Sequence, residues 1–181
     1  MSREIRLNEL KKENRMGCKD IDPIYYVEGL IDFINFFDIK NKKGVEEGSY
    51  LGVSTEVFAL FNNQITSVDP HQNQQVYSKF LERIKSYPNI KSVKDLSQNF
   101  IRAIPDDSLD FVYIDSIHHY KHMMEVMPLW RVKIKQGGIM CGHDYSDIWP
   151  GVIKAVDELA ESKVETFLDS SWGYKVSKNK Y

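Results

Sequence analysis

The stretch Gly44-Val45-Glu46-Glu47-Gly48-Ser49-Tyr50-Leu51-Gly52-Val53-Ser54-Thr55 decides how the rest of the chain is interpreted. It contains a short strand-like entry, two glycines, and the start of an apolar run with helical spacing. Glycine permits a tight turn and close approach of the backbone to a ligand, and a helix N-terminus offers free N–H groups. The stretch is typical of the nucleotide pocket of an α/β protein, although the glycines could also serve only the turn and its packing.

The second informative stretch, Ile65-Thr66-Ser67-Val68-Asp69, is a predicted strand that ends in an acid. An acid at this distance from the glycine turn can accept hydrogen bonds from both hydroxyls of a ribose. Asp69-Pro70 is also a good turn former, and the two interpretations are compatible. The spacing predicts an adenosine-containing ligand.

Strands and helices alternate along the remainder of the chain, with glycines where several strands end. This order predicts an α/β fold in one domain over residues 1–181, built on a mostly parallel seven-stranded sheet with helices on both faces. Residues 1–40 form an N-terminal arm (or short irregular helix) and a helix, and residues 43–181 form the core. The predicted strands are 44–47, 65–69, 90–94, 109–115, 139–142, 165–168 and 173–176, and the predicted helices are 22–37, a helix from about 53, 72–86, 98–103, 119–133 and 150–161.

Three local expectations accompany this scheme. Ser97 is predicted to cap the helix over 98–103. Pro128 should kink or break the helix over 119–133. Glu47 is out of place in a buried parallel strand, which normally consists of apolar residues.

Composition excludes several classes of function. The net charge is −2, with 28% charged residues, so there is no electrostatic case for nucleic acid or a membrane surface. No apolar run approaches the roughly 20 residues of a membrane helix, and the polar N-terminus has no signal-peptide core. Cys18 and Cys141 lie far apart, as is usual in a reduced, cytoplasmic protein.

Residues 45–55 resemble the E-x-G-x-x-x-G-x-S-T loop of the class I S-adenosylmethionine-dependent methyltransferases. A dinucleotide site would instead show G-x-G-x-x-G. Two later blocks are Ile114-Asp115-Ser116-Ile117-His118-His119-Tyr120 and Gly137-Gly138-Ile139-Met140-Cys141-Gly142-His143-Asp144-Tyr145. They resemble the I-D-x-x-H-x-Y and G-G-x-x-x-x-H-D-Y motifs of the small "methyltransferase domain 24" type. This type is related to metal-dependent O-methyltransferases of macrolide sugars. The resemblance covers about residues 43–160 and implies a Rossmann-like fold.

The resemblance implies S-adenosylmethionine as the cofactor. The methionine part would be held by Glu46, Gly48 and Ser54 or Thr55, and the ribose by Asp69. Asp95 and Ser97 would face the adenine, although Asp95 could equally be a loop or capping acid. Tyr50, Gly52 and Asp115 complete the predicted cofactor site.

Asp115 and Asp144 are predicted to end two neighbouring strands. Two carboxylates in one cleft repel unless one is protonated or a cation lies between them. Oxygen ligands with an open position suit Mg²⁺ or another divalent metal, with His143 as a third ligand or a neighbour. A histidine there would shift the preference towards Mn²⁺, Fe²⁺ or Zn²⁺, or would leave metal binding weak. In the alternative to a metal site, Asp144 caps a helix or a turn and Asp115 binds the amino group of the cofactor.

His118 follows Asp115 by three residues, and the resemblance places the catalytic base here, with Asp115 beside it. The predicted reaction is O-methylation of a small, sugar-like acceptor. Rivals are a hydroxylase-like enzyme of the same branch and a non-catalytic S-adenosylmethionine-binding partner module. Because the chain has no sizeable insertion to enclose an acceptor, the N-terminal arm or a second copy in a homo-oligomer would have to do so.

Overall fold

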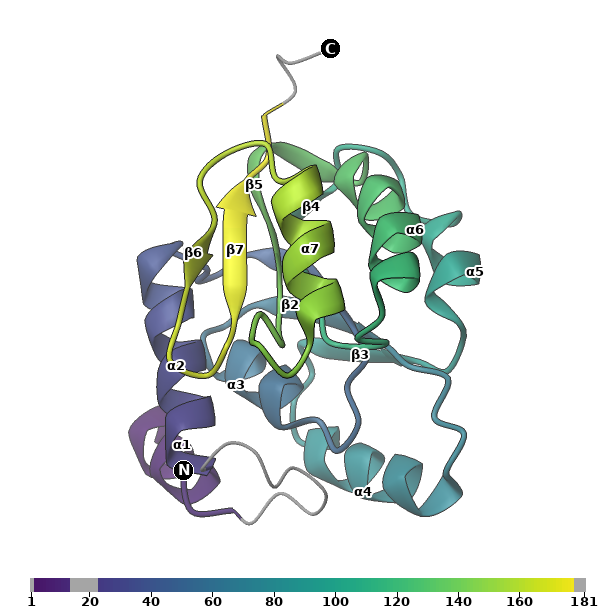
Figure 1. The fold of residues 1–181 in the computed structure, drawn as a ribbon. Helices are drawn as coiled ribbons and strands as arrows, with labels where there is room; N and C mark the ends of the chain where they lie inside the picture. Colours follow the sequence, from purple (N-terminus) through teal and green to yellow (C-terminus); the bar gives the residue numbers. More distant parts are fainter. Residues whose placement is uncertain (1, 14–22, 178–181) are drawn as a thin grey trace.

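A computed structural model describes residues 2–13 and 23–177 of the chain (Figure 1). A seven-stranded sheet in the order β3-β2-β1-β4-β5-β7-β6 runs through its middle. The first five strands are parallel, and β7 is antiparallel to both β5 and β6. The strands are β1 (Lys43–Glu47), β2 (Gln64–Val68), β3 (Ile90–Val93), β4 (Leu109–Ile114), β5 (Ile134–Gly142), β6 (Glu165–Thr166) and β7 (Trp172–Lys175).

Helices cover both faces of the sheet, as the alternation of elements predicts. The helices are α1 (Arg3–Leu10), α2 (Pro23–Phe36), α3 (Val53–Leu60), α4 (Gln74–Ile84), α5 (Ser97–Ile101), α6 (Tyr120–Arg131) and α7 (Pro150–Leu159). One apolar cluster joins α5, α6 and α7 to the sheet, and another joins α1, α2 and α3 to the opposite face. Within the described ranges, no helix is long and apolar enough to cross a bilayer.

The alternation of side chains along β1 connects the sheet to both layers. Val45 lies in the cluster with α6 and α7, whereas a Cβ at Gly44 would meet the Phe111 ring at 2.3 Å in the other layer. Successive residues of a strand point to opposite faces, so Glu46 and Glu47 face different helices.

The strand order reverses between β1 and β4. From β1 the chain adds β2 and β3 on one side, and β4 and β5 lie on the other. In open α/β sheets, ligands bind outside the carboxyl ends of the strands at such a switch point. The fold therefore places the ends of β1 and β4 at the centre of any binding site.

Four local predictions need correction. Residues 3–10 form a regular helix that buries Leu7 and Leu10, so this part of the N-terminus is not an arm. Strand β5 begins at Ile134 rather than 139, and Gly137 lies inside it with a φ of 74°.

The other two corrections concern helices. Helix α6 continues through Pro128 to Arg131, so of the predicted kink or break the break is absent. Ser97 is the first residue of α5 and Leu96 is its N-cap, because the Ser97 hydroxyl is engaged elsewhere. Cys18 and the predicted helix start at residue 22 lie outside the described residues.

A buried ion network ties α1 to the core. Glu56 on α3 has a side chain only 1% exposed, and it accepts hydrogen bonds from Arg6 Nε at 2.6 Å and Arg83 Nη1 at 2.8 Å. Tyr87 donates to the same carboxylate at 2.5 Å. Burial alone would raise the pKa of Glu56, but these donors hold that pKa below its ordinary value. Glu56 is therefore ionised in the folded protein and paired with two cations.

Candidate active site

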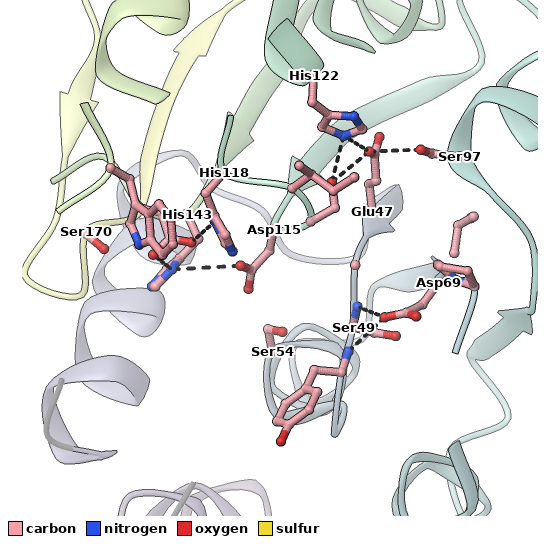
Figure 2. Close-up of a pocket in the computed structure, with 18 of the residues that line it drawn as sticks. Glu47, Ser49, Ser54, Asp69, Ser97, Asp115, His118, His122, His143 and Ser170 are labelled. Carbon is pink, nitrogen blue, oxygen red and sulfur yellow. Dashed lines mark hydrogen bonds and ion pairs between the residues drawn. The ribbon is translucent and has the colours of Figure 1, made fainter. Parts of the chain in front are cut away.

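A cavity of about 930 Å³ opens at the carboxyl ends of the parallel strands (Figure 2). Its walls come from the loops that follow β1, β2, β4 and β5, from the start of α5, and from Tyr26 of α2. Several exposed apolar side chains contribute to its lining, namely Tyr50, Leu96, Ile117, Ile148 and Leu168.

The backbone hydrogen bonds of the sheet continue into the loops that form the cavity. These bonds run from Gly48 N to Val68 O (2.8 Å), from Asp69 N to Val93 O (3.1 Å), from Asp115 N to Glu47 O (2.8 Å) and from His143 N to Ile114 O (3.0 Å). We call this set the rim ladder. It fixes the four loops side by side through main-chain atoms alone.

The glycine loop needs glycine for steric reasons. Gly48 has a φ of +85°, and a Cβ there would lie 2.2 Å from the Asp115 carbonyl oxygen. Gly52 has a φ of +78°, and its Cβ would meet the Phe80 ring at 2.8 Å. Residues with a side chain rarely adopt these angles. Gly48 therefore allows β1 and β4 to end in close contact.

Asp69 holds the glycine loop in place. Its Oδ2 accepts hydrogen bonds from Ser49 N at 2.9 Å and Tyr50 N at 3.1 Å, and its Oδ1 accepts from His71 N at 2.7 Å. The side chain remains 17% exposed and lines the cavity. This places the carboxylate predicted to bind ribose directly beside the loop.

Glu46 lies beneath the cavity on the α3 side. It is fully buried, its Oε2 accepts from the Thr55 hydroxyl, and its Oε1 has no hydrogen-bond partner among the described residues. Burial raises its pKa to about 8, helped by the charges of Asp115 and Asp69 and opposed by the hydroxyls of Ser54 and Thr55. An unsatisfied buried acceptor of this kind suits a cationic N–H donor arriving from the cavity.

Glu47 faces the opposite layer and is 2% exposed. Its Oε1 accepts from Ser97 Oγ at 2.9 Å, Ser116 Oγ at 2.8 Å and His122 Nε2 at 2.9 Å, and its Oε2 accepts from Trp130 Nε1. These donors resolve the misfit predicted for an acid in this strand. Three of the donors, Ser97, Ser116 and His122, form a polar part of the cavity wall together with Glu47, and Figure 2 labels Glu47, Ser97 and His122.

Three side chains with metal-binding atoms converge on the other side of the cavity. One ligand atom from each of Asp115, His118 and Asp144 lies within 4.8 Å of the other two. His118 Nδ1 is 2.5 Å from Asp144 Oδ2, and the His118 ring packs on Trp149 with centroids 4.4 Å apart. Asp144 has a φ of 64°, a left-handed conformation that aspartate tolerates.

Charge pairing sets the protonation of this group. Burial alone would lower the pKa of His118, but the hydrogen bond and charge of Asp144 raise it above its ordinary value. Burial alone would also lower the pKa of His143, but the carboxylates of Asp115 and Asp144 raise it to about 9. Burial alone would raise the pKa of Asp144, but hydrogen bonds from His118 and His143 lower it below its ordinary value. His143 Nδ1 lies 3.1 Å from Asp144 Oδ1 and 3.9 Å from Asp115 Oδ1, so this nitrogen faces both carboxylates.

Comparison with known families now decides the identity of the chain. A family profile described as "Methyltransferase domain" matches residues 45–145, more than half of the chain. The chain belongs to this methyltransferase family. It is an S-adenosylmethionine-dependent methyltransferase of class I. Among curated proteins, no relative matches the sequence.

Solved structures share the fold of this methyltransferase at low identity. A TDP-rhamnose 3'-O-methyltransferase of calicheamicin biosynthesis superposes with a TM-score of 0.68 at 12% identity, over 96% of this chain and 92% of that one. A putative O-methyltransferase from Klebsiella pneumoniae gives 0.66 at 10% identity, over 94% and 89%. The N-methyltransferase NodS from Bradyrhizobium japonicum, in complex with S-adenosyl-L-homocysteine, gives 0.63 at 14% identity, over 97% and 99%.

The structure of the methyltransferase brings most of the predicted site residues to one cavity. Those that line it are Gly48, Tyr50, Ser54, Asp69, Ser97, Asp115, His118, His143 and Asp144. Four predicted cofactor residues are not part of the lining: Glu46, Gly52, Thr55 and Asp95. Glu46 and Thr55 are buried behind it, whereas Asp95 is exposed and bonds to Leu96 N and Asn99 Nδ2.

Sequence reasoning missed several contributors to the cavity wall, among them Ser116, His122, Tyr26 and Ser170. His122 lies on α6 and contacts Glu47, a partner 75 residues away, so no local pattern indicates it. Tyr26, which packs edge-on against His143 with centroids 5.1 Å apart, reaches the site from α2. Ser170 comes from the connection between β6 and β7, and no sequence pattern marks either residue.

Proposed function

We propose that this methyltransferase transfers a methyl group from S-adenosylmethionine to a hydroxyl of a small, sugar-like acceptor. One observation carries the proposal: a single cavity has the glycine loop with Asp69 on one side and His118, Asp144 and Asp115 on the other. Donor and acceptor can therefore meet without leaving the protein. Holding them in line is the main catalytic task, because the sulfonium is already activated.

The donor side offers groups that match the polar ends of the methyl donor. Asp69 lines the cavity and would accept hydrogen bonds from the ribose hydroxyls. The partnerless Oε1 of Glu46 would accept from the ammonium of the methionine part, next to Ser54, which lines the cavity. A cation beside Glu46 would also lower the pKa that burial raises and favour the ionised carboxylate.

On the acceptor side, His118 would act as the proton acceptor. Its Nδ1 faces Asp144, which fixes the ring and favours a proton on Nδ1, leaving the lone pair of Nε2 for the acceptor hydroxyl. The hydroxyl proton passes to Nε2 while the oxygen forms its bond to the methyl carbon. The carbon–sulfur bond breaks with its electron pair on sulfur, which leaves as a neutral thioether.

A divalent metal is a second use of the same side chains. Asp115, His118 and Asp144 would hold it, because their ligand atoms converge, whereas His143 is absent from the converging group. Two carboxylates and an imidazole are a donor set that fits Mn²⁺, Fe²⁺ or Zn²⁺ as well as Mg²⁺. A bound cation would supply positive charge that lowers the pKa of an acceptor hydroxyl.

Product mass tests the reaction directly. Purified protein would be incubated with S-adenosylmethionine and a panel of hydroxylated sugars, nucleotide sugars and phenols, and the products analysed by mass spectrometry. Gain of one methyl group by an acceptor, with formation of S-adenosylhomocysteine, supports the proposal. Gain of one oxygen would indicate the hydroxylase-like alternative, and cofactor binding with no product from any acceptor would favour a binding module.

Replacing Asp69 with alanine is expected to weaken S-adenosylhomocysteine binding by roughly 10- to 100-fold, because hydrogen bonds to a charged carboxylate are lost. The loop amides of Ser49 and Tyr50 lose the same acceptor. Isothermal titration calorimetry measures the change. Asp106→Ala is a matched control, since that carboxylate is 66% exposed and pairs with Lys133 away from the cavity. Unchanged affinity of Asp69→Ala would contradict the assignment.

Removal of divalent metal is expected to lower turnover if the converging side chains hold a cation. The enzyme would be treated with a chelator, dialysed, and assayed with and without added Mg²⁺ or Mn²⁺. Recovery of activity with one of these ions supports the metal site. Full activity after chelation, with no metal found by elemental analysis, would leave His118 to act as a base alone.

A further inference from the structure

The polar wall around Glu47 has a role that the reaction alone does not explain. Glu47, Ser97, Ser116 and His122 all line the cavity, and the other three each contact Glu47 Oε1. Figure 2 shows Glu47, Ser97 and His122 together above Asp69. These three are at least nine-tenths buried, at 2% exposed for Glu47, 8% for Ser97 and 9% for His122. A buried carboxylate is costly unless donors satisfy it, so the arrangement of its partners is strongly constrained.

Counting hydrogens fixes the direction of each bond. Glu47 Oε1 faces Ser97 Oγ, Ser116 Oγ and His122 Nε2, and Oε2 faces Trp130 Nε1. A carboxylate oxygen accepts and cannot donate, so the hydroxyls of Ser97 and Ser116 are the donors in their bonds to Glu47. His122 Nε2 also lies 3.0 Å from Ser116 Oγ, and with the imidazole proton on Nε2 the histidine donates to Glu47 and leaves the Ser116 proton to Glu47 as well. The longer contact of Ser97 with Gln98 Oε1, at 3.4 Å, does not compete with the 2.9 Å bond.

As a result, the hydroxyls of Ser97 and Ser116 present only their lone pairs to a ligand in the cavity. A ligand group that approaches Ser97 and Ser116 must donate hydrogen bonds. Turning either hydroxyl round to donate to the ligand would remove a donor from the buried Glu47, which costs more than an ordinary hydrogen bond returns. Glu47 thus converts two adaptable hydroxyls into fixed acceptors.

The surroundings of this wall suit a purine base. Leu96 and Ile117, each 52% exposed, line the cavity next to Ser97 and Ser116 in the chain and offer apolar contacts to the faces of a flat ring. Asp69, assigned above to the ribose, lies on the loop after β2, beside β1 and its Glu47.

We infer that Glu47 is a positioning residue that makes this subsite selective for a purine with an amino group, rather than an oxo group, at its 6-position. The inference rests on the proposed binding of S-adenosylmethionine and specifies how its base is recognised. The 6-amino group donates to the lone pairs of Ser97 and Ser116. A 6-oxo group is itself an acceptor, so it could not form a hydrogen bond with the lone pairs of the two serines.

Two ligands that differ at this one position provide the test. Wild-type enzyme is titrated calorimetrically with S-adenosylhomocysteine and with S-inosylhomocysteine, its 6-oxo analogue. The expected preference for the amino compound is roughly 10- to 100-fold, because the oxo compound leaves acceptors facing each other.

In the Glu47→Gln variant, the ratio of the two dissociation constants is expected to fall close to one. A glutamine has one acceptor oxygen and its own NH₂ donor, so it cannot accept from all four partners, and the serine hydroxyls become free to donate to an oxo group. Ser97→Ala and Ser116→Ala retain Glu47 and remove one acceptor each, so each should lower the preference, and they decide the question if Glu47→Gln does not fold. Ser67→Ala is the matched control, because Ser67 is buried, lacks a hydrogen-bond partner in the described structure and is not in the lining.

The outcomes separate this inference from the proposed function. If the wild type binds both compounds equally, and Asp69→Ala weakens both, the inference is overturned while the cofactor site stands. An unchanged preference in Ser97→Ala and Ser116→Ala would also overturn it. If the wild type binds neither compound, the proposed function fails and the inference fails with it.

Discussion

Replacing His118 with alanine should lower kcat by about 10²- to 10⁴-fold, the usual contribution of a positioned general base. The expected loss is large because Asp144 and Trp149 hold the imidazole in one orientation, at 2.5 Å from the carboxylate and 4.4 Å between ring centroids. Affinity for S-adenosylhomocysteine should stay near the wild-type value, since the glycine loop and Asp69 are untouched. Steady-state kinetics and calorimetry measure the two quantities.

The same variant distinguishes a base from a metal ligand. If His118 is a ligand, Asp115 and Asp144 remain, so a high concentration of metal should restore part of the activity. If it is the base, added metal should have no effect. His119→Ala is the neighbouring control, because His119 is not in the cavity lining. A His118→Ala enzyme with normal turnover, or one that loses cofactor affinity instead, would contradict the assigned role.

Replacing Glu56 with alanine should reduce the free energy of unfolding by about 3–5 kcal/mol, the usual cost of breaking a buried ion pair from one side. The change leaves Arg6 and Arg83 without the carboxylate that both contact, and it also removes the acceptor of Tyr87. For a chain of this length, the melting temperature should fall by roughly 10 °C. Chemical denaturation and differential scanning calorimetry provide the measurement.

The pH dependence of stability gives an independent check on Glu56. Its folded-state pKa lies below the ordinary 4.5, so its stabilisation is present above that value and is lost as the pH falls towards the lowered pKa. Glu56→Ala should therefore lose less stability than the wild type on acidification. The exposed pair Glu82–Lys85 is the control, and Glu82→Ala should change stability by less than about 1 kcal/mol. Equal effects of the two substitutions would show that the network contributes little.

The parts of the fold that depend on local pattern are predictable from the sequence. The apolar stretch Leu109–Ile114 and the glycine turn at Gly48 each have a periodicity or a steric requirement that is visible in a short window. The carboxyl ends of parallel strands meet at one edge, so the strand pattern alone assigns Asp69, Asp115 and Asp144 to one site. The mostly parallel seven-stranded sheet is confirmed.

The errors arise where partners lie far apart in the sequence. Glu47 is a misfit by local pattern because its donors His122 and Trp130 are 75 and 83 residues away. The N-terminal segment resembles an arm because Arg6 finds Glu56 only after 50 residues. Ser97 has the local features of a helix cap, but its hydroxyl has a distant acceptor instead. In each case a long-range hydrogen bond overrides a local preference.

The rim ladder has a consequence for how such an enzyme can change over time. The loops that carry Gly48, Asp69, Asp115 and His143 are joined by main-chain bonds. Gly48 must stay glycine, but at the other three positions any amino acid other than proline can donate such a bond. Apart from Gly48, side chains in these loops can therefore be exchanged one at a time while the main-chain bonds remain. A descendant of this protein could therefore acquire a different acceptor, or lose its chemistry altogether, while the spacing between its loops stayed the same.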